Sequence, residues 1–246
     1  MTTDDARVRH RQGAARIVDG IPYADPASTL SLLPGAAVGQ WLAAHTELLG
    51  GRLLDNGCGN QPFRSWYEPW VKQVVALDAT PGDGVGVLGF ADRLPFAAET
   101  FDTVLATEVL EHVEDVERAA AELFRVLRPG GHVLITVPYL YPTHEAPYDF
   151  RRFTHFGLAD LLRRHGFEVL SLQAKGGPGI MLAHYAVLAV TQALGTRTEN
   201  PRLRRMLAAP QQAFAHRRQV SRDPVGRSGI ISLGYMAAAR KPLAGS

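Results

Sequence analysis

The chain contains 246 residues, of which 46% are hydrophobic and 20% charged, and its formal net charge is +2 at pH 7. This length and apolar content fit a single domain over residues 1–246 with a sizeable core. The small charge, without a polybasic run, argues against a nucleic acid as partner. The single cysteine, Cys58, excludes an intramolecular disulfide and a cysteine-rich metal site.

The N-terminal region is expected to form an arm over residues 1–36. Residues 1–20 are polar and lack the basic start and apolar stretch of a signal peptide, which favours a cytoplasmic protein. Ile21–Pro26 is a proline-punctuated segment and is predicted to be a loop. Helical apolar spacing then predicts a helix over Ala37–Leu49.

The most informative stretch begins at Leu53, where an apolar strand runs into a glycine-rich turn. A helical stretch follows, and a second apolar strand, Val74–Asp78, ends on a carboxylate about twenty residues later. Gly57 and Gly59 allow a ligand to approach the backbone, and Asp78 is placed to accept hydrogen bonds from two ribose hydroxyls. The pattern predicts a site for a nucleoside-containing cofactor.

The same turn argues against one class of cofactor. Nicotinamide and flavin folds carry a third glycine three residues after the second, where a pyrophosphate needs room, but this chain has Pro62 there. The cofactor is therefore expected to lack a pyrophosphate, and a nicotinamide-dependent oxidoreductase is disfavoured.

The next elements alternate between strand and helix periodicity. Strands are predicted over Thr103–Thr107, His132–Pro138 and Phe167–Leu172, and helices over Val116–Leu127 and Leu158–His165. This alternation predicts an α/β fold with a parallel sheet and helices on both of its faces.

The alternation breaks over residues 176–229, which are predicted to form a helical insertion before a final strand at residues 230–241. The insertion holds an apolar helix, Ile180–Leu194, and an arginine-rich helix, Arg202–Arg218. The apolar run is shorter than the roughly 20 residues that a membrane span needs, so no transmembrane segment is expected, although contact with a membrane or lipid-linked substrate stays open. An insertion here would lie beside the carboxyl ends of the strands and help select the substrate. The alternative is that the two helices only support folding or the formation of a homodimer.

Five motifs in order make the chain resemble the class I S-adenosylmethionine (SAM) methyltransferases, type 11. They are D-x-G-C-G at Asp55–Gly59, the acid Asp78, the adenine-binding stretch Ala91–Phe96, the strand opening Phe101–Val104, and the turn Leu127–Gly131. The resemblance implies a Rossmann-like, mostly parallel sheet with an antiparallel C-terminal hairpin. It further implies a SAM-binding core over residues 50–175 and S-adenosylhomocysteine as the product.

The resemblance also implies which residues bind SAM. The expected cofactor contacts are Asp55, Gly57, Cys58, Gly59, Asp78, Ala79, Ala91, Asp92 and Thr107. Asp92 is expected to accept a hydrogen bond from the adenine amino group. Related enzymes fold an N-terminal segment over cofactor and acceptor, so the arm with Tyr23 is expected to act as a lid that excludes water.

Transfer to a hydroxyl requires a base, and two polar clusters follow strands at the expected active edge: Thr107–His112 and Pro142–Asp149. We predict His144 as the base, with Asp149 or Glu145 orienting its ring and His112 or Glu108 as the reserve. The predicted catalytic residues are His144, Glu108 and Asp149. The predicted substrate contacts are Tyr23, His112, Glu145, Arg151 and Arg152. The two arginines are expected to bind acceptor hydroxyls or to hold the loop. The alternative for His112 is a structural role in which it packs on a helix.

The segment His144–Thr154 resembles one in bacterial methyltransferases of polysaccharide and sugar-modifying pathways. This resemblance implies a SAM-dependent O-methyltransferase acting on a hydroxyl of a sugar or oligosaccharide. The alternatives are a natural-product hydroxyl, a prenylated quinone ring, and a SAM-binding protein without catalysis. Which hydroxyl reacts stays open.

A metal is not implied by the sequence. Oxygen and imidazole ligands for a divalent ion such as magnesium could come from Glu108, Glu111, His144, Glu145 and Asp149. No H-x-x-x-H or cysteine pattern indicates zinc, and we expect no tightly held metal.

Overall fold

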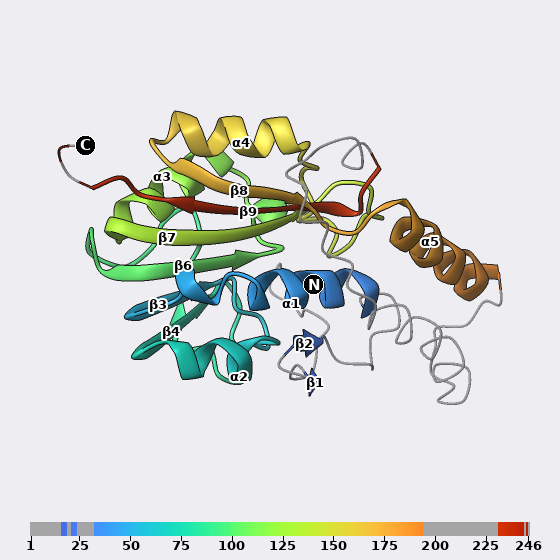
Figure 1. Cartoon of the computed structure of the whole chain (residues 1–246), viewed down its shortest axis with the longest axis horizontal. Helices are drawn as coiled ribbons and strands as arrows, with labels where there is room; N and C mark the ends of the chain where they lie inside the picture. Colours follow the sequence, from blue (N-terminus) through green and yellow to red (C-terminus); the bar gives the residue numbers. More distant parts are fainter. Residues whose placement is uncertain (1–15, 19–20, 24–31, 194–230, 244, 246) are drawn as a thin grey trace, which may run out of the picture.

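The computed structural model describes residues 16–18, 21–23, 32–193, 231–243 and 245. Its centre is a seven-stranded sheet in the order β5-β4-β3-β6-β7-β9-β8 (Figure 1). In chain order the strands are β3 (Arg52–Asn56), β4 (Gln73–Asp78), β5 (Val87–Leu88), β6 (Phe101–Thr107), β7 (Leu127–Pro138), β8 (Glu168–Ala174) and β9 (Gly234–Arg240).

Strands β5, β4, β3, β6 and β7 pair in parallel, and β9 pairs antiparallel with both β7 and β8. The sheet is therefore mostly parallel and ends in an antiparallel hairpin, as predicted. Strand β3 lies between β4 and β6, so the strand order reverses beside it. In open α/β sheets, ligands bind beyond the carboxyl ends of the strands at such a reversal.

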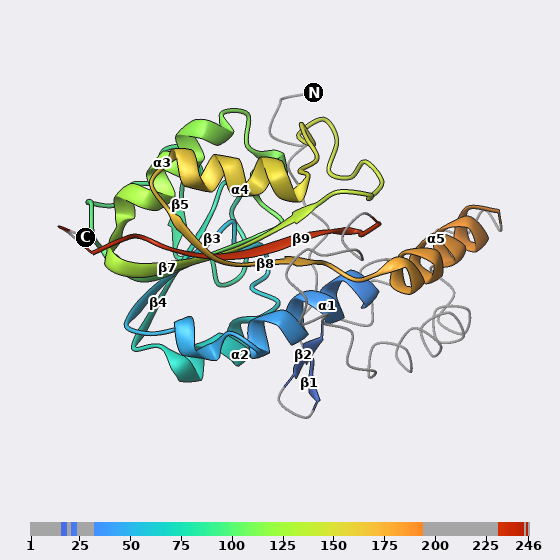
Figure 2. The same cartoon turned by 45° about the horizontal axis from the view of Figure 1, so that its top comes forward.

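Helices cover both faces of the sheet (Figures 1 and 2). The α-helices are α1 (Leu32–Ala43), α2 (Arg64–Tyr67), α3 (Val116–Val126), α4 (His155–Arg164) and α5 (Pro178–Ala193). Short 3-10 helices are η2 (Thr46–Leu48), η3 (Glu68–Trp70) and η4 (Leu110–His112). The first two α-helices lie on one face of the sheet, and α3 and α4 lie on the other.

The core follows the two-residue period of the strands. On β6, Val104 and Ala106 pack in the cluster that contains α3 and α4, whereas Leu105 packs with Trp41 of α1 and Trp66 of α2. Successive side chains of a strand point to opposite faces, so a nearly continuous apolar strand fills both cores. This is why the central strands read as apolar runs in the sequence.

Capping side chains fix where two helices begin. The Asp115 carboxylate accepts a hydrogen bond from the Arg118 amide at 3.0 Å and starts α3. The Thr154 hydroxyl accepts one from the Gly157 amide at 3.0 Å, so α4 begins at His155, three residues before the predicted start.

Several boundaries differ from the sequence predictions. Arg16–Val18 (β1) and Ile21–Tyr23 (β2) pair as an antiparallel hairpin, so the prediction of a loop from Ile21 was wrong over that strand. Strand β7 starts at Leu127 rather than His132, because Leu127 already pairs with Phe101 of β6. The short strand β5 was not predicted, since two residues carry no periodicity.

The helical insertion is described only in its first part. Helix α5 follows β8 and extends beyond the end of the sheet (Figures 1 and 2). The predicted helix Arg202–Arg218 lies outside the described residues. Among the helices of the described ranges, none is long and apolar enough to cross a membrane.

Candidate active site

The glycine-rich turn after β3 is held against the end of β4. The amides of Gly57 and Cys58 both donate to the Leu77 carbonyl, at 2.8 and 2.9 Å. Gly57 and Gly59 have φ values of +70° and +50°. A Cβ on Gly59 would meet nothing within 4 Å, whereas a Cβ on Gly57 would lie 2.5 Å from Cγ2 of Val109. Gly59 therefore faces open space where a ligand can approach the backbone, and Gly57 packs against the next loop.

The Asp78 carboxylate is fixed at the tip of β4. Its Oδ2 accepts from the Gly59 amide at 2.9 Å, and its Oδ1 accepts from the amide and hydroxyl of Thr80, each at 2.9 Å. The residue is buried. A carboxylate held in this way beside the glycine turn fits the acceptor that a ribose needs. Its contact with ribose stays a prediction.

The predicted adenine stretch lies next to Asp78. Leu88 of β5 pairs with Asp78, and the Gly89 amide donates to the Asp78 carbonyl at 3.0 Å. Ala91 is buried, and Asp92 Oδ1 lies 3.8 Å from Nε of Arg93. The sheet thus brings the two predicted cofactor acids, Asp78 and Asp92, to adjacent loops.

Asp55 has a partner that the sequence did not indicate. The Tyr67 hydroxyl donates to Asp55 Oδ2 at 2.5 Å, and both residues are buried. Burial raises the pKa of Asp55 to about 6, although the Tyr67 hydrogen bond lowers it. This contact joins α2 to the cofactor turn. Of the other predicted cofactor contacts, Cys58 is buried. Ala79 follows β4 and Thr107 ends β6, so both lie at the carboxyl edge of the sheet.

Glu108, which follows β6, is engaged by two neighbours. Its Oε2 lies 2.5 Å from Nζ of the buried Lys175, and its Oε1 accepts from the Thr136 hydroxyl at 2.6 Å. Burial alone would raise the pKa of Glu108, but the charge and hydrogen bond of Lys175 outweigh it and lower that pKa. Glu108, one of the two predicted reserve bases, is therefore an ion-paired carboxylate, which is a poor proton acceptor.

The loop after β7 is anchored by its two arginines. The Arg151 guanidinium donates to the carbonyls of Leu110, Val113 and Glu114. The Arg152 guanidinium binds both carboxylate oxygens of Asp149 and donates to the carbonyls of Tyr141, Pro142 and Arg151. The donors of both arginines therefore hold the loop in this structure, and contact of either one with an acceptor stays a prediction.

Asp149 connects that anchor to His144. Its Oδ2 accepts from the His144 amide at 2.9 Å and lies 3.3 Å from Nδ1 of the His144 ring. Burial would raise the pKa of Asp149, but the hydrogen bonds from Arg152 and the His144 amide hold it at about 2. Asp149 is thus an ionised side chain beside Nδ1 of the imidazole, and its orienting role stays a prediction. Glu145 lies instead 3.9 Å from Nε2 of His112.

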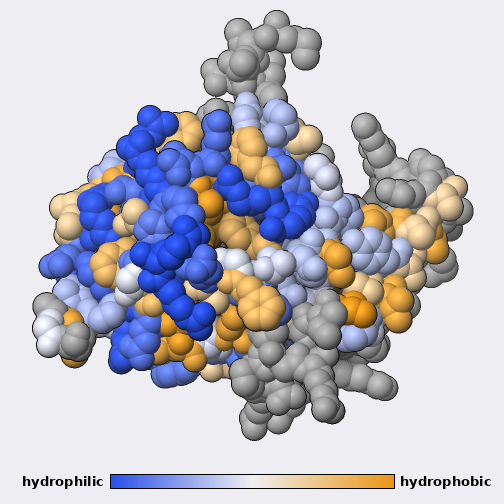
Figure 3. Space-filling view, turned by 90° about the horizontal axis from the view of Figure 1, so that it is seen from above, coloured by the Kyte–Doolittle hydropathy of each residue, from blue (hydrophilic) through white to orange (hydrophobic). Residues whose placement is uncertain are grey.

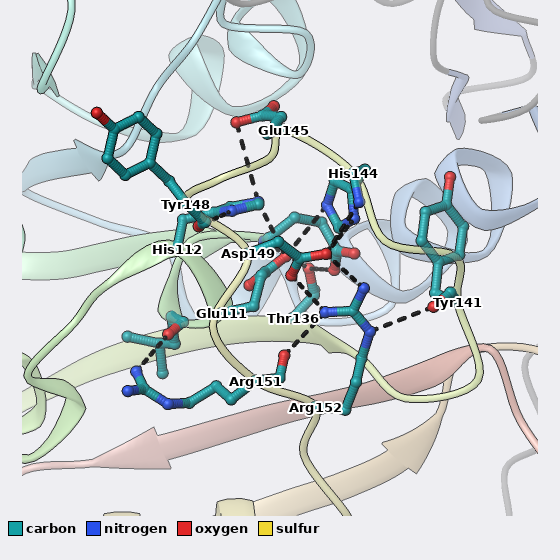
Figure 4. Close-up of polar contacts among 12 residues, drawn as sticks. Glu111, His112, Thr136, Tyr141, His144, Glu145, Tyr148, Asp149, Arg151 and Arg152 are labelled. Carbon is teal, nitrogen blue, oxygen red and sulfur yellow. Dashed lines mark hydrogen bonds and ion pairs between the residues drawn. The ribbon is translucent and has the colours of Figure 1, made fainter. Parts of the chain in front are cut away.

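Two imidazoles and one carboxylate meet between the loops after β6 and β7 (Figure 4). Nε2 of His112 and of His144 lie 3.7 and 3.9 Å from Oε1 of Glu111, and the two rings are 4.8 Å apart, edge to face. Burial and the nearby Glu108 carboxylate raise the pKa of Glu111 well above its ordinary value.

Helix α5 closes one side of this edge with a polar residue. The His184 ring stacks on Tyr141 at 5.2 Å, and Tyr141 contacts His144 edge to face at 5.3 Å. Burial and the charge of Lys175 lower the pKa of His184 to about 4, while burial and Glu108 raise that of Tyr141 to about 12. Figure 3 shows hydrophobic side chains on α5. Leu182 of this helix is exposed.

The structure therefore adds partners that sequence reasoning missed. They are Tyr67, Thr136, Tyr141, Lys175 and His184. Only the position of Lys175, three residues after a predicted strand, could have suggested one of them. The predicted substrate contact Tyr23 lies in β2, and its side chain is outside the described part of the structure.

Comparisons with known proteins agree with the cofactor half of the site. A methyltransferase-domain profile matches residues 54–135. A probable S-adenosylmethionine-dependent methyltransferase of Mycolicibacterium smegmatis is 27% identical over 176 residues, 61% of this chain and 68% of that protein. Malonyl-[acyl-carrier protein] O-methyltransferase of Serratia marcescens is 34% identical over 97 residues, 35% of this chain and 38% of that enzyme. The match thus spans little more than a third of the second relative.

The fold is similar to that of a solved S-adenosylmethionine-dependent methyltransferase from Mesorhizobium loti. The TM-score is 0.52 at 20% identity, covering 85% of this chain and 99% of the other. The profile match runs from the strand before the glycine turn to the last parallel strand, and the strand order is that of a mostly parallel sheet with an antiparallel end. The methyltransferase-domain match and the methyltransferase relatives support a class I SAM-dependent methyltransferase.

Proposed function

We propose that the protein transfers a methyl group from SAM to a hydroxyl of a sugar or oligosaccharide, with His144 as the base. The observation that supports this proposal best is the orientation of His144. Its Nδ1 faces the Pro142 carbonyl at 3.2 Å and Asp149 at 3.3 Å, which turns Nε2 toward the Glu111 side of the loop. An imidazole held by an acid through one nitrogen is suited to accept a proton at the other.

The cofactor half of the proposal is supported by the glycine turn. The open space over Gly59 and the fixed Asp78 carboxylate fit a nucleoside ligand, and these residues with Asp92 would hold it. Bound SAM supplies a methyl group on a sulfonium, which an attacking oxygen displaces in line. Val109 packs on Gly57 and lies two residues before Glu111, so the turn and the imidazole cluster are neighbours.

The protein's own contribution is to position the acceptor and to remove its proton. The His144 side chain is 27% exposed and that of Glu145 39%, so this part of the cluster faces solvent and can meet an acceptor. Glu111 is fully buried below them. The partly exposed groups are hydrogen-bonding groups, which favours an oxygen-rich acceptor over an apolar ring. General-base assistance of this kind contributes typically ~10²–10⁴ in rate.

The acceptor class is tested by methyl transfer from SAM labelled with tritium in its methyl group. The purified chain is offered oligosaccharides, phenolic natural products and a prenylated hydroquinone at equal concentrations. We expect label in the carbohydrate, as an ether stable to mild base. Label on the quinone ring carbon would select the carbon-methylating alternative. SAM binding without transfer to any acceptor would favour a SAM-binding protein without catalysis.

A further inference from the structure

The cluster below His144 has the composition of a metal site. Glu111 and His112 come from η4, and His144 comes from the loop after β7. One ligand atom from each of the three lies within 4.8 Å of the other two. Figure 4 shows the three side chains converging from the two loops. They therefore present two imidazole nitrogens and one carboxylate to a common point.

The ring orientations fit metal ligation. Nδ1 of His112 lies 2.8 Å from the Tyr148 carbonyl, and Nδ1 of His144 lies 3.2 Å from the Pro142 carbonyl. Carbonyl oxygens only accept, so each Nδ1 carries a proton in these contacts, and a ring in this tautomer presents its Nε2 lone pair toward Glu111. Asp149 lies beside Nδ1 of His144. A carboxylate in this position commonly orients a histidine whose other nitrogen binds a metal.

Glu111 supplies an independent observation. Its side chain is 0% exposed, and within the described residues neither carboxylate oxygen has a hydrogen-bond partner. Leaving a buried polar group unsatisfied costs about 1–3 kcal/mol, and more for a charged one. The carboxylate instead faces the Nε2 atoms of His112 and His144 at 3.7 and 3.9 Å. A cation between the three groups would satisfy all of them.

We propose that Glu111, His112 and His144 bind one divalent transition-metal ion, such as Zn²⁺, Fe²⁺ or Mn²⁺. Two ligands about 2.1 Å from a tetrahedral ion lie about 3.4 Å apart, so the observed separations from Glu111 need to shorten by only a few tenths of an ångström. Imidazole ligands favour these ions over Mg²⁺ and Ca²⁺, which prefer oxygen ligands alone. Three protein ligands leave a coordination position open beside the partly exposed His144.

The proposal replaces the ligand set that the sequence suggested. Glu108 is held by Lys175 and Thr136, and Asp149 by Arg152, so neither carboxylate faces the common point. His112 was not among the suggested ligands, and no tightly held metal was expected. The ligand spacing, two adjacent residues and one far along the chain, matches no compact sequence pattern.

The role of the ion, unlike the site itself, rests on the proposed function. At the open position it would hold an oxygen of the acceptor and lower the pKa of its hydroxyl. A coordinated Nε2 has no lone pair left for a proton, so His144 acts as the base only in the metal-free protein. In the loaded protein His144 orients the ion instead.

The site is tested by titrating Co²⁺ into the full, untagged and chelator-treated chain, with visible absorption and calorimetry as readouts. We expect one ion per chain. Glu111→Gln and His144→Asn should each weaken binding by roughly 100-fold or more, since changes to outer partners alone cost about 10–100-fold. Asp149→Asn, which alters the orienting partner and its pair with Arg152 but no ligand, should weaken it by about 10–100-fold. His165→Asn, at a histidine that pairs with Glu117 instead, should bind like the native protein.

Failure to bind Co²⁺ at one ion per chain would overturn the proposal, as would equal binding by native, Glu111→Gln and His144→Asn proteins. Circular dichroism on each variant identifies a loss of binding that is only a loss of fold, and His112→Asn then serves as the second ligand variant. None of these readouts needs turnover. If the metal binds but no acceptor is methylated, the metal site is supported and the proposed function is contradicted. If methyl transfer occurs but no metal binds, the proposed function is supported and the metal site is contradicted.

Discussion

Replacing Gly59 and Gly57 separately by alanine should damage two different properties of the protein. A Cβ on Gly59 projects into open space, so Gly59→Ala should fold nearly normally but block the approach of SAM. A Cβ on Gly57 would lie 2.5 Å from Cγ2 of the buried Val109, so Gly57→Ala should mainly lower stability. The two glycines are two residues apart, which makes each the control for the other.

The magnitudes follow from the backbone and from the contact. Both residues have positive φ, +70° for Gly57 and +50° for Gly59, and a side chain in that region costs roughly 1–2 kcal/mol. Gly57→Ala adds overpacking against a stiff β-branched side chain, typically ~1–3 kcal/mol more. We therefore expect losses in the free energy of unfolding of about 1–2 kcal/mol for Gly59→Ala and about 2–5 kcal/mol for Gly57→Ala.

Urea unfolding gives the stabilities, and calorimetry with SAM gives the affinities. Gly59→Ala should bind SAM at least about tenfold more weakly, a loss of ~1.4 kcal/mol. Val109→Ala should recover part of the stability of Gly57→Ala in a double-mutant cycle, because it removes the clashing methyl groups. Native SAM affinity in Gly59→Ala would refute the reasoning about the open space. An additive cycle would refute the clash.

Three further substitutions test other contacts. Asp78→Ala should weaken SAM binding by about 1.5–3 kcal/mol in calorimetry, because buried ribose hydroxyls lose a charged acceptor, and an unchanged affinity would contradict its role. Burial raises the pKa of Asp55 to about 6, so its contribution to folding stability is present below pH ~4 and is lost as the pH rises through 6. Between pH 4 and 7 the free energy of unfolding of the native protein should therefore fall by roughly 2–3 kcal/mol more than that of Asp55→Asn. Parallel pH profiles of the two proteins in urea unfolding would refute the shift. Lys175→Met should lower the free energy of unfolding by about 1–3 kcal/mol by leaving Glu108 unpaired, and adding Glu108→Gln should restore much of it; no recovery would show that the pair is not the cause.

The fold could be predicted because its signals are local. Apolar strands such as Val74–Asp78, capped helices and the glycine turn each constrain a short segment, and alternation of strand and helix then determines the layers. The observed strand boundaries differ from the predicted ones where pairing with another strand determines them. Leu127 extends β7 only because Phe101 lies beside it, and the two-residue β5 exists only because β4 provides its hydrogen bonds.

The candidate site could be predicted in outline but not in its pairing. Sequence placed His144 and Glu108 at the same edge, because both follow parallel strands, but it gave both as potential bases. Lys175 comes 67 residues after Glu108, and that ion pair is visible only in the folded chain. Holding the loop was one of two roles predicted for the arginines, but most of their acceptors are backbone carbonyls, which no sequence pattern marks.

The most direct test of the account is a single-turnover measurement of methyl transfer from SAM to a carbohydrate hydroxyl, with native, His144→Ala and His165→Ala proteins. In the metal-free protein, loss of this base should slow transfer by about 10²–10⁴-fold, and in the loaded protein loss of this ligand should slow it as well. The SAM affinity of His144→Ala should stay near that of the native protein, and His165→Ala should react at the native rate. Transfer at the native rate by His144→Ala would contradict the claim that this imidazole activates the acceptor.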